Sequence, residues 1–572
     1  MKNYYKLLIL ALAASSSSNA QTANRHDIVI DELFPDPAGQ TVLPNAEFIE
    51  LKNISHTSFN LKNWKITDGN STATINTDII LKPDSFLIVC SNAAVAAYSL
   101  IGTTVGVSGF PSLNNDMDLV SLISPEGKII HTVNYNIDWY HNDIKASGGW
   151  SLEMIDPQNA CVGYNNWKAS ENSSRGTPGS ANSVDALNKD EQPPALMRTY
   201  TIDSVTIMAV FDEQLDGNSA AGVSNYSFDP DIGSPIQANP VSPLFSEVMI
   251  KLSAPLSHDK VYTMSVRSVK DCAGNIIGSA NKTKAGKNEL AESLDIVVNE
   301  LFFNPPAGGF DYIELYNRSN KIVDLYSIYF ANRNSTGNLT NSIRVSSIPY
   351  LLFPGEYMAI TENSKWLMQN FVLPHEAMMI EILKLHSLPD DKGMVVLTNE
   401  QGIVIDEIQY DEKWHFGLID KKEGVALERI DYNKPTQNKD NWISAAYVVG
   451  YGTPGYKNSQ FMAVAEIKAA VEVDPKVFSP DNDGYNDLAI IQYQFDEPGY
   501  TGSVVVYDAN GHTVRYIARQ ALLGSKGSFR WDGLDEKARE LPLGVYIVMI
   551  EVFNLKGQLK RFKNALVLAR KF

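Results

Sequence analysis

Short runs of alternating apolar and polar residues recur along most of the chain, separated by Asn, Asp, Gly and Pro. In its N-terminal part these runs read IVIDEL, FIELKN, FLIVCS, LVSLIS and KIIHTV. A period of two places alternate side chains on opposite faces, so each run predicts a β-strand. Helical spacing is indicated only for a short segment near Asn363 to Phe371. Many short strands bounded by turn residues predict an all-β chain of sandwiches or barrels.

This pattern occurs twice in the sequence. DIVIDELFPDPAG at residue 27 returns as DIVVNELFFNPPAG at 295, and NWKASENSSRGTPGSANS at 166 returns as NWISAAYVVGYGTPGYKNS at 441. A repeat of this length is a duplicated domain and not a solenoid unit. We expect Trp167 and Trp442 to plug one end of each sandwich, and the Gly-Thr-Pro-Gly turn to end its last strand.

The residues of the two copies resemble bacterial lamin-tail domains, which are Ig-like β-sandwiches. The resemblance rests on Glu-Leu at 32, F-I-E-L-x-N, S-L-E-x-I-D and the N-W…G-T-P-G…N-S ending, and it assigns residues 27–183 and 294–458 to two such domains. Between them, residues 190–288 resemble bacterial Ig-like domains that end in V-x-D-x-x-G-N. The resemblance implies tandem Ig-like sandwiches in an exported bacterial protein, and no single activity.

Residues 471–572 resemble the C-terminal domains of gliding-motility-associated and type IX-secreted proteins, and the Ig-like domain of flagellar hook-capping proteins. The matching positions are Tyr507, Asp508, Gly511, Trp531, Asp532, Gly533, Pro542, Gly544 and Tyr546. The sequence departs from the family at Asp481-Asn482-Asp483-Gly484, usually Asn-Gly-Asp-Gly, and at Ala538, usually Gly. The resemblance implies a Bacteroidota protein with the type IX secretion machinery as a partner.

The N-terminus predicts export. Residues 1–20 combine Lys2 and Lys6 with an apolar run too short to span a bilayer, and end in Ser-Asn-Ala, which reads as a signal peptide cleaved after Ala20. No later stretch is long and apolar enough for a transmembrane helix. We expect the mature protein at the cell surface, associated with the outer membrane, or outside the cell, rather than in the periplasm.

The net charge of the chain limits the classes of partner that we expect. The formal net charge of −18 would repel phosphate backbones, so we expect no nucleic-acid partner. The partner that we expect is therefore a cell-surface or outer-membrane protein, or a glycan. The C-terminal tail is basic against this background, through Lys556, Lys560, Arg561, Lys563, Arg570 and Lys571. That tail suits an export or attachment partner, and edge-strand lysines that prevent sheet pairing explain it equally well.

Three cysteines occur, Cys90, Cys161 and Cys272. An odd number leaves at least one without an intramolecular partner. We expect either a Cys90–Cys161 bridge or two buried free thiols.

The densest set of potential metal ligands is DNDGYND, with Asp481, Asp483 and Asp487. Ca²⁺ prefers six to eight hard oxygens, and this spacing is similar to that of short calcium loops. The alternative is that these side chains bond their own backbone and shape a turn. No other cofactor is indicated.

Catalytic motifs are not evident. The histidines are scattered, and neither H-E-x-x-H nor G-x-S-x-G occurs. Glu50 aligns with Glu314 and Glu153 with Glu428, and we expect each to pair with a buried backbone donor or a basic neighbour. The aromatic residues that form either a binding face or part of the core are Tyr135, Trp139, Tyr140 and Trp150.

The sequence therefore predicts a non-catalytic, exported binding and scaffold protein of adhesin type. A subunit of an outer-membrane complex is one alternative. A secreted hydrolase with its active site in the loops is another.

Overall fold

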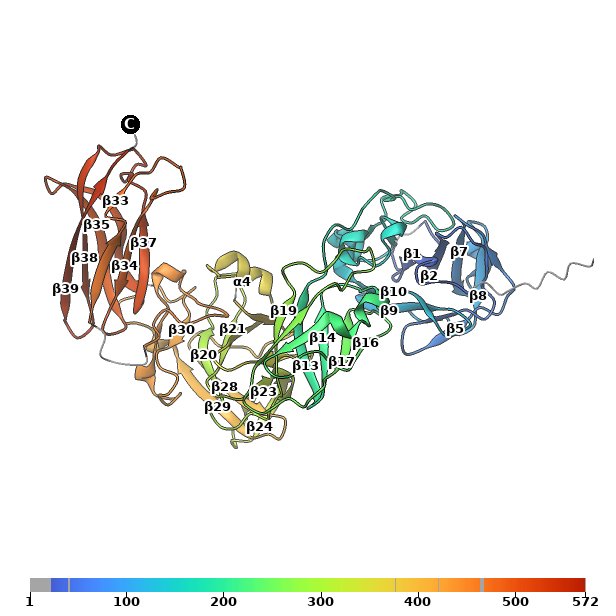
Figure 1. Ribbon diagram of the computed structural model, residues 1–572, viewed down its shortest axis with the longest axis horizontal. Coiled ribbons are helices and arrows are strands. Elements are labelled where there is room, and N and C mark those ends of the chain that lie inside the picture. The colour runs from blue at the N-terminus through green and yellow to red at the C-terminus, as the bar shows by residue number, and fades with distance from the viewer. Residues whose placement is uncertain (1–21, 40–41, 376, 420, 463–467, 571–572) are drawn as a thin grey trace, which may run out of the picture. The chain divides into compact units, whose positions relative to one another are not determined.

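The structure, a computed structural model, describes residues 22–39, 42–375, 377–419, 421–462 and 468–570, so the expected signal peptide lies outside it. Strands dominate and helices are short, which confirms the predicted all-β class (Figure 1). The chain divides into two compact units. The first holds the residues up to Arg198 with 205–254 and 263–283, and the second holds 199–204, 255–262 and 284–572.

The first sandwich, within residues 27–183, packs a six-stranded sheet, in the order β12-β11-β1-β2-β7-β8, against a four-stranded sheet, in the order β10-β9-β4-β5. Its strands are β1 (Ile28–Phe34), β2 (Phe48–Asn53), β3 (Phe59–Asn60), β4 (Lys65–Thr67), β5 (Thr72–Thr74), β6 (Ile80–Leu81), β7 (Phe86–Ser91), β8 (Thr104–Val107), β9 (Met117–Ile123), β10 (Ile129–Asn136), β11 (Leu152–Met154) and β12 (Trp167–Ala169). Two short helices, α1 (Val95–Tyr98) and α2 (Asp143–Ala146), lie in its connections. Each run expected to be a strand forms one, and Trp167 is 1% exposed in the core, as predicted.

The middle sandwich, within residues 190–288, has a four-stranded sheet, β13-β14-β17-β16, and a three-stranded sheet, β15-β18-β19. The strands are β13 (Leu196–Asp203), β14 (Thr206–Phe211), β15 (Tyr226–Asp229), β16 (Gln237–Pro240), β17 (Glu247–Lys251), β18 (Tyr262–Val266) and β19 (Lys282–Ala285), with one helical turn, α3 (Gly217–Ala220).

The third sandwich, within residues 294–458, repeats the topology of the first. Its sheets run β27-β26-β21-β20-β30-β31 and β24-β23-β28-β29. The strands are β20 (Ile296–Phe302), β21 (Tyr312–Asn317), β22 (Val323–Asp324), β23 (Ile328–Arg333), β24 (Leu339–Arg344), β25 (Leu351–Leu352), β26 (Tyr357–Thr361), β27 (Met379–Glu381), β28 (Lys392–Asn399), β29 (Val404–Asp411), β30 (Leu427–Arg429) and β31 (Trp442–Ser444). The one predicted helix forms as α4 (Ser364–Asn370), capped by the Asn363 side chain.

The C-terminal sandwich pairs a three-stranded sheet, β32-β34-β37, with a five-stranded sheet, β33-β39-β38-β35-β36. The strands are β32 (Ala470–Asp474), β33 (Val477–Phe478), β34 (Ala489–Gln494), β35 (Tyr500–Asp508), β36 (Thr513–Leu523), β37 (Lys526–Trp531), β38 (Gly544–Phe553) and β39 (Leu559–Leu568). Trp531 is 1% exposed and packs against Phe478 and Tyr546. Ala538 has a φ of 56°, a left-handed conformation that favours glycine and is strained for alanine.

Among the described residues, none of the helices has the length and hydrophobicity needed to cross a membrane.

Candidate ligand-binding cleft

The cysteines do not pair as the sequence led us to expect. Cys161 forms a disulfide with Cys272, 111 residues away. Cys90 is a buried free thiol in β7, opposite Phe48, and packs in a small apolar cluster that includes Tyr98. The predicted Cys90–Cys161 bridge is wrong because Cys90 is held inside the first sandwich, whereas Cys161 lies in a loop that reaches the middle sandwich. The disulfide therefore joins two domains of the first unit.

A cleft of about 570 Å³ lies beside this disulfide, lined by residues of both domains and by Cys161 itself. We call it the junction cleft and define it by Trp139, Tyr164, Asp190, Asp212 and Glu213. The first two come from the first sandwich, in the segment between β10 and β12. The three acidic residues come from the entry segment of the middle sandwich and from the turn after β14. The cleft thus exists only where the two domains meet.

Three carboxyl groups converge on one side of the junction cleft. Oxygen atoms of Asp190, Glu213 and Asp271 all lie within 4.8 Å of one another. Asp271 is fully buried, and its Oδ1 accepts bonds from the backbone N–H groups of Gly274 (2.6 Å) and Asn275 (2.8 Å). The loop after β18 therefore fixes Asp271 beneath the two carboxyl groups that line the cleft.

This crowding disfavours ionisation. Burial, followed by the negative charges of Asp271 and Asp190, raises the pKa of Glu213 to about 8. Burial also raises the pKa of Asp190, whose Oδ1 accepts from Gln192 N–H (3.0 Å) and whose buried Oδ2 has only the Glu213 carboxyl group beside it as a possible donor among the described residues. The two carboxyl groups are close enough to share one proton, which is how carboxyl pairs of this kind relieve their repulsion.

The other wall of the junction cleft is aromatic. Trp139 is partly buried, packs against the core, and lies so close to Gly163 that an added Cβ there would be 2.8 Å from its ring. Tyr164 is 48% exposed, and its ring centroid lies 4.3 Å from that of His141, with the two ring planes tilted by 59°. Trp167 forms the buried floor behind Trp139, with ring centroids 6.1 Å apart. The junction cleft is therefore lined by both aromatic and acidic side chains.

Sequence reasoning found little of this site. Of the four aromatic residues singled out, Tyr135 and Tyr140 are buried in the core, and only Trp139 lines the cleft. Trp150 is held between Lys145 and Arg175, at 4.4 and 5.3 Å from its ring centroid. Asp190, Glu213, Asp271 and Tyr164 were missed. Two features of the sequence could have indicated the acidic part of the site. The tripeptide Asp-Glu-Gln occurs at both 190 and 212, and an aspartate precedes Cys272.

The aligned glutamates have the structural role that we expected. Glu32, Glu50 and Glu153 lie side by side on β1, β2 and β11 and are fully buried. The Gly-Thr-Pro-Gly turn sits on them: Thr177 N–H donates to Glu32 (2.8 Å), Thr177 O–H donates to Glu153 (2.9 Å), and Gly179 N–H donates to Glu50. Burial raises the pKa of Glu32 to about 8.

The third sandwich repeats this arrangement. Thr453 donates to Glu300 and Glu428, and Gly455 N–H donates to Glu314 (2.7 Å). The repeated turn is thus a plug that saturates a row of buried carboxyl groups and closes the sandwich. These carboxyl groups have no exposed surface.

The buried carboxyl groups of the first and third sandwiches differ at one neighbouring position. Asp31 occupies the strand bulge beside Glu32, is fully buried, and has no hydrogen-bond partner for either carboxyl oxygen among the described residues. Its counterpart is Asn299, whose amide N–H donates to Glu314 (2.6 Å) and to Asn458 (2.7 Å). Burial raises the pKa of Asp31 to about 7. A protonated Asp31 would reproduce the donor that Asn299 supplies.

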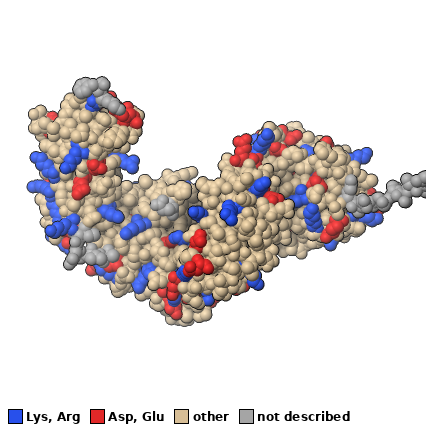
Figure 2. Space-filling model, in the orientation of Figure 1, with Lys and Arg blue, Asp and Glu red and all other residues tan. Residues whose placement is uncertain are grey.

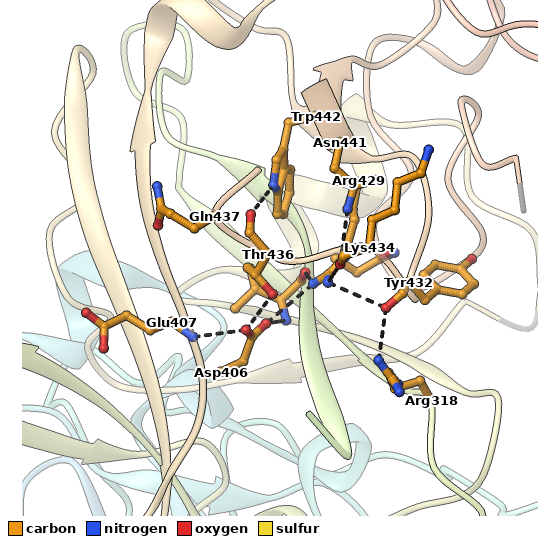
Figure 3. A network of polar contacts seen from close by, with 12 residues as sticks. Arg318, Asp406, Glu407, Arg429, Tyr432, Lys434, Thr436, Gln437, Asn441 and Trp442 are labelled. Carbon is orange, nitrogen blue, oxygen red and sulfur yellow. Dashed lines mark hydrogen bonds and ion pairs between the residues drawn. The ribbon is translucent and has the colours of Figure 1, made fainter. Parts of the chain in front are cut away.

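A second buried network is specific to the third sandwich (Figure 3). Arg429 is fully buried, donates to the carbonyls of Val298 (3.1 Å) and Lys434 (2.7 Å), and forms an ion pair with Asp406 (3.5 Å). Asp406 also accepts from the hydroxyl of Thr436 (2.6 Å). The network ties the loop after β30 to the core. It is shielded from solvent, so its role is structural.

The acidic loop predicted as a calcium site is a turn held by its own backbone. Asp487 accepts from the N–H groups of Asn482 (2.7 Å) and Gly484 (2.9 Å), and Asp483 accepts from Tyr485 N–H (2.9 Å). Oxygen atoms of Asp481, Asp483 and Asp487 also lie within 4.8 Å of one another. Both expectations for this loop therefore remain compatible with its geometry.

The basic tail is largely neutralised within its own sandwich. Figure 2 shows many lysine and arginine side chains over the C-terminal sandwich. Lys556 pairs with Glu497, Lys560 with Asp496, Arg561 with Glu551 and Arg570 with Glu540. The tail therefore offers less free positive charge than its sequence indicates.

Comparisons with known proteins support the domain types. A family model for the lamin tail domain matches residues 21–136, and one for a bacterial Ig-like domain matches residues 189–284. No curated protein matches the chain.

Similar solved structures include CopC from Methylosinus trichosporium OB3b, at 20% identity over 15% of this chain and 76% of that chain, with a TM-score of 0.11. The N-terminal part of the bacterial S-layer protein SbsC matches at 19% identity over 38% of this chain and 44% of that chain, with a TM-score of 0.16. A tetra-tandem repeat from the extending region of a large adhesion protein matches at 12% identity over 95% of this chain and 99% of that chain, with a TM-score of 0.12. These likenesses are too low to support a statement about function. What the family models establish is that the chain contains a lamin tail domain and a bacterial Ig-like domain.

Proposed function

We propose that this chain is an exported, non-catalytic binding and scaffold protein of the cell surface, and that the junction cleft holds its ligand. This proposal rests on one observation: two domains joined by a disulfide form one cleft that is lined by acidic and aromatic side chains. Disulfides persist in oxidising compartments, which supports export. Aromatic walls with a few polar groups are typical of binding sites.

The same proposal covers the remaining domains. Residues 294–458 are taken as a second lamin-tail domain, because their strand order repeats that of the first. Residues 471–572 are taken as a type IX-like export or attachment domain of a Bacteroidota protein, on the sequence resemblance alone. The protein would then act at the outer membrane or outside the cell, alone or as a subunit of a surface complex.

The location is tested by protease treatment of intact cells, followed by mass spectrometry of both termini. Accessible protein that lacks its last domain would make that domain a removed sorting signal. Accessible protein that retains Phe572 would favour a surface complex or adhesin. Protection from protease would contradict surface exposure.

Binding is tested by pull-down of the full mature chain from cell-surface extracts. Replacing Tyr164 with Ala, or Glu213 with Gln, should reduce partner recovery. Glu126→Gln, on the exposed hairpin between β9 and β10, is the matched control and should leave recovery unchanged. Equal recovery with all three variants would remove the cleft from the proposal.

A hydrolase is the second candidate, favoured by the raised pKa of Glu213 beside Asp190, since active sites often contain such pairs. Glycosidases also use a pair of carboxyl groups, about 5–5.5 Å apart in retaining and about 6.5–9.5 Å apart in inverting enzymes, and the nearest oxygen atoms of Asp190 and Glu213 lie within 4.8 Å of each other. Turnover of polysaccharide or peptide panels that Glu213→Gln abolishes would establish the hydrolase instead.

Calcium binding at Asp481, Asp483 and Asp487 also stays a proposal. Three carboxylates supply hard oxygens for Ca²⁺, but Asp487 already accepts several backbone N–H groups. A Ca²⁺-dependent rise in the melting temperature that Asp483→Asn removes would support the site. No change with Ca²⁺ would leave the loop a turn.

A further inference from the structure

Acidic side chains line the junction cleft, and no basic side chain is among the described residues that line it. Asp190, Asp212 and Glu213 line it, Asp271 lies beneath, and none of its lining residues within the described chain is lysine or arginine. Lys189 and Lys270 neighbour the acidic residues in sequence, but both are exposed and neither lines the cleft. A ligand that brings a positive charge would relieve the repulsion among the carboxyl groups.

The aromatic wall suits the same charge. Cations are attracted to the faces of aromatic rings, and Tyr164, which is half-exposed, lines the same cleft as Asp190 and Glu213. The protein already binds one guanidinium in this way nearby. Arg25 lies 4.2 Å above the ring of Phe245 and donates to Gln214, which lines the cleft.

The shape of the site favours a side chain over a free ion. A volume of about 570 Å³ exceeds what a bare cation needs and falls in the range of pockets for organic ligands. Asp271, the most buried of the acidic groups, already accepts three N–H groups, which leaves few free oxygens for a metal. The planar, weakly hydrated guanidinium of arginine pairs with carboxylates and stacks on aromatic rings, so it fits both walls.

We propose that the junction cleft binds an arginine side chain presented by an extended segment of a partner protein, with Glu213 and Asp190 pairing with the guanidinium and Tyr164 contacting its face. This inference rests on the proposed function, because it names the ligand of the same cleft. The peptide chain on either side of the arginine would contact the amide side chains that also line the cleft, Asn165, Gln192 and Gln214.

The test is titration of the full mature chain, with its disulfide intact, against labelled peptides followed by fluorescence anisotropy. The probes are one capped peptide with a central arginine and otherwise neutral residues, and matched peptides with lysine, citrulline or glutamate at that position. Citrulline has the shape of arginine without its charge. We expect the arginine peptide to bind about ten-fold more tightly than the citrulline peptide, with lysine between them.

The variants separate local recognition from general attraction by an acidic protein. Glu213→Gln should weaken arginine-peptide binding about five-fold or more, and Tyr164→Ala about three-fold. Glu126→Gln, which removes one exposed carboxylate elsewhere on the first sandwich, should have no effect. Equal weakening by Glu126→Gln, or equal affinity for arginine and citrulline peptides, would overturn the inference.

The outcomes also distinguish this inference from the function on which it rests. Binding of the citrulline peptide or of a neutral oligosaccharide that Tyr164→Ala abolishes would keep the cleft as a binding site and refute the cationic ligand. Failure of every probe, together with unchanged partner recovery by the cleft variants, would refute both.

Discussion

Asp31→Asn should stabilise the first sandwich above neutral pH. Burial raises the pKa of this carboxyl from 3.8 to about 7, with a smaller opposing effect from Lys52 and further raising effects from Asp185 and Glu153. At about 1.36 kcal/mol per unit, ionising the folded form costs on the order of 4 kcal/mol well above pH 7. Asparagine never ionises, and it supplies the amide donor that Asn299 gives in the third sandwich.

The sign follows from proton binding. A carboxyl group whose folded pKa is raised binds more protons in the folded state, so its contribution to stability is complete below about pH 4 and is lost as pH rises through about 7. The advantage of Asp31→Asn over the natural chain should therefore be small near pH 4 and reach on the order of 2–4 kcal/mol near pH 8.

The assay is hydrogen–deuterium exchange of the full mature chain, read by mass spectrometry on peptides that cover β1 and β2. It reports the local free energy of opening and so separates the first sandwich from the other domains. The reciprocal variant, Asn299→Asp, is the matched control, since an aspartate there would face Glu314 at hydrogen-bond distance. It should speed exchange in β20 and β21 at high pH. Faster exchange in Asp31→Asn at both pH values would refute the reasoning.

Three further predictions concern other parts of the chain. Arg429→Met, the residue type of the first copy, should cost about 3–5 kcal/mol because it leaves Asp406 buried without its cation, and adding Asp406→His should recover part of the loss in urea unfolding. Ala538→Gly should raise stability by about 1 kcal/mol by relieving a left-handed alanine, whereas an unchanged melting temperature would deny strain there. Non-reducing peptide mapping should recover a Cys161–Cys272 cross-linked peptide, and Cys272→Ser should lower the stability of the middle sandwich by about 4–5 kcal/mol, as the length of the closed loop implies.

The strands could be predicted from the sequence because the alternation of apolar and polar residues, and the turn residues between strands, determine structure over a few neighbouring residues. The run FIELKN forms a strand with the bounds expected, and the helix after Asn363 begins at its capping residue. The duplication made the second copy predictable from the first. Even the role of the aligned glutamates followed, since an acidic residue at a buried strand position must find a donor.

The junction cleft could not be predicted from the sequence because it forms only where particular loops of two domains come into contact. Nothing in the spacing of Cys161 and Cys272 distinguishes that pair from one with Cys90, and pairing was decided by the burial of Cys90 within β7. Tyr164 lies in a loop whose neighbours come from a segment beginning with Asp190. Single residues such as these become a site only through tertiary contacts.

The disulfide also gives the chain a mechanical property. Nearly all of the middle sandwich lies between Cys161 and Cys272 in the sequence, inside a covalently closed loop. A force applied at the two ends of the chain is carried through the sulfur–sulfur bond, so the segment between the two cysteines, whose sequence separation is 111, cannot be extended even when the surrounding strands unfold. At about 3.3–3.6 Å per residue, about 370–400 Å of extension is withheld until the bond is reduced. For a protein anchored at one end and loaded at the other, the junction would hold its shape at tensions that unravel its neighbours.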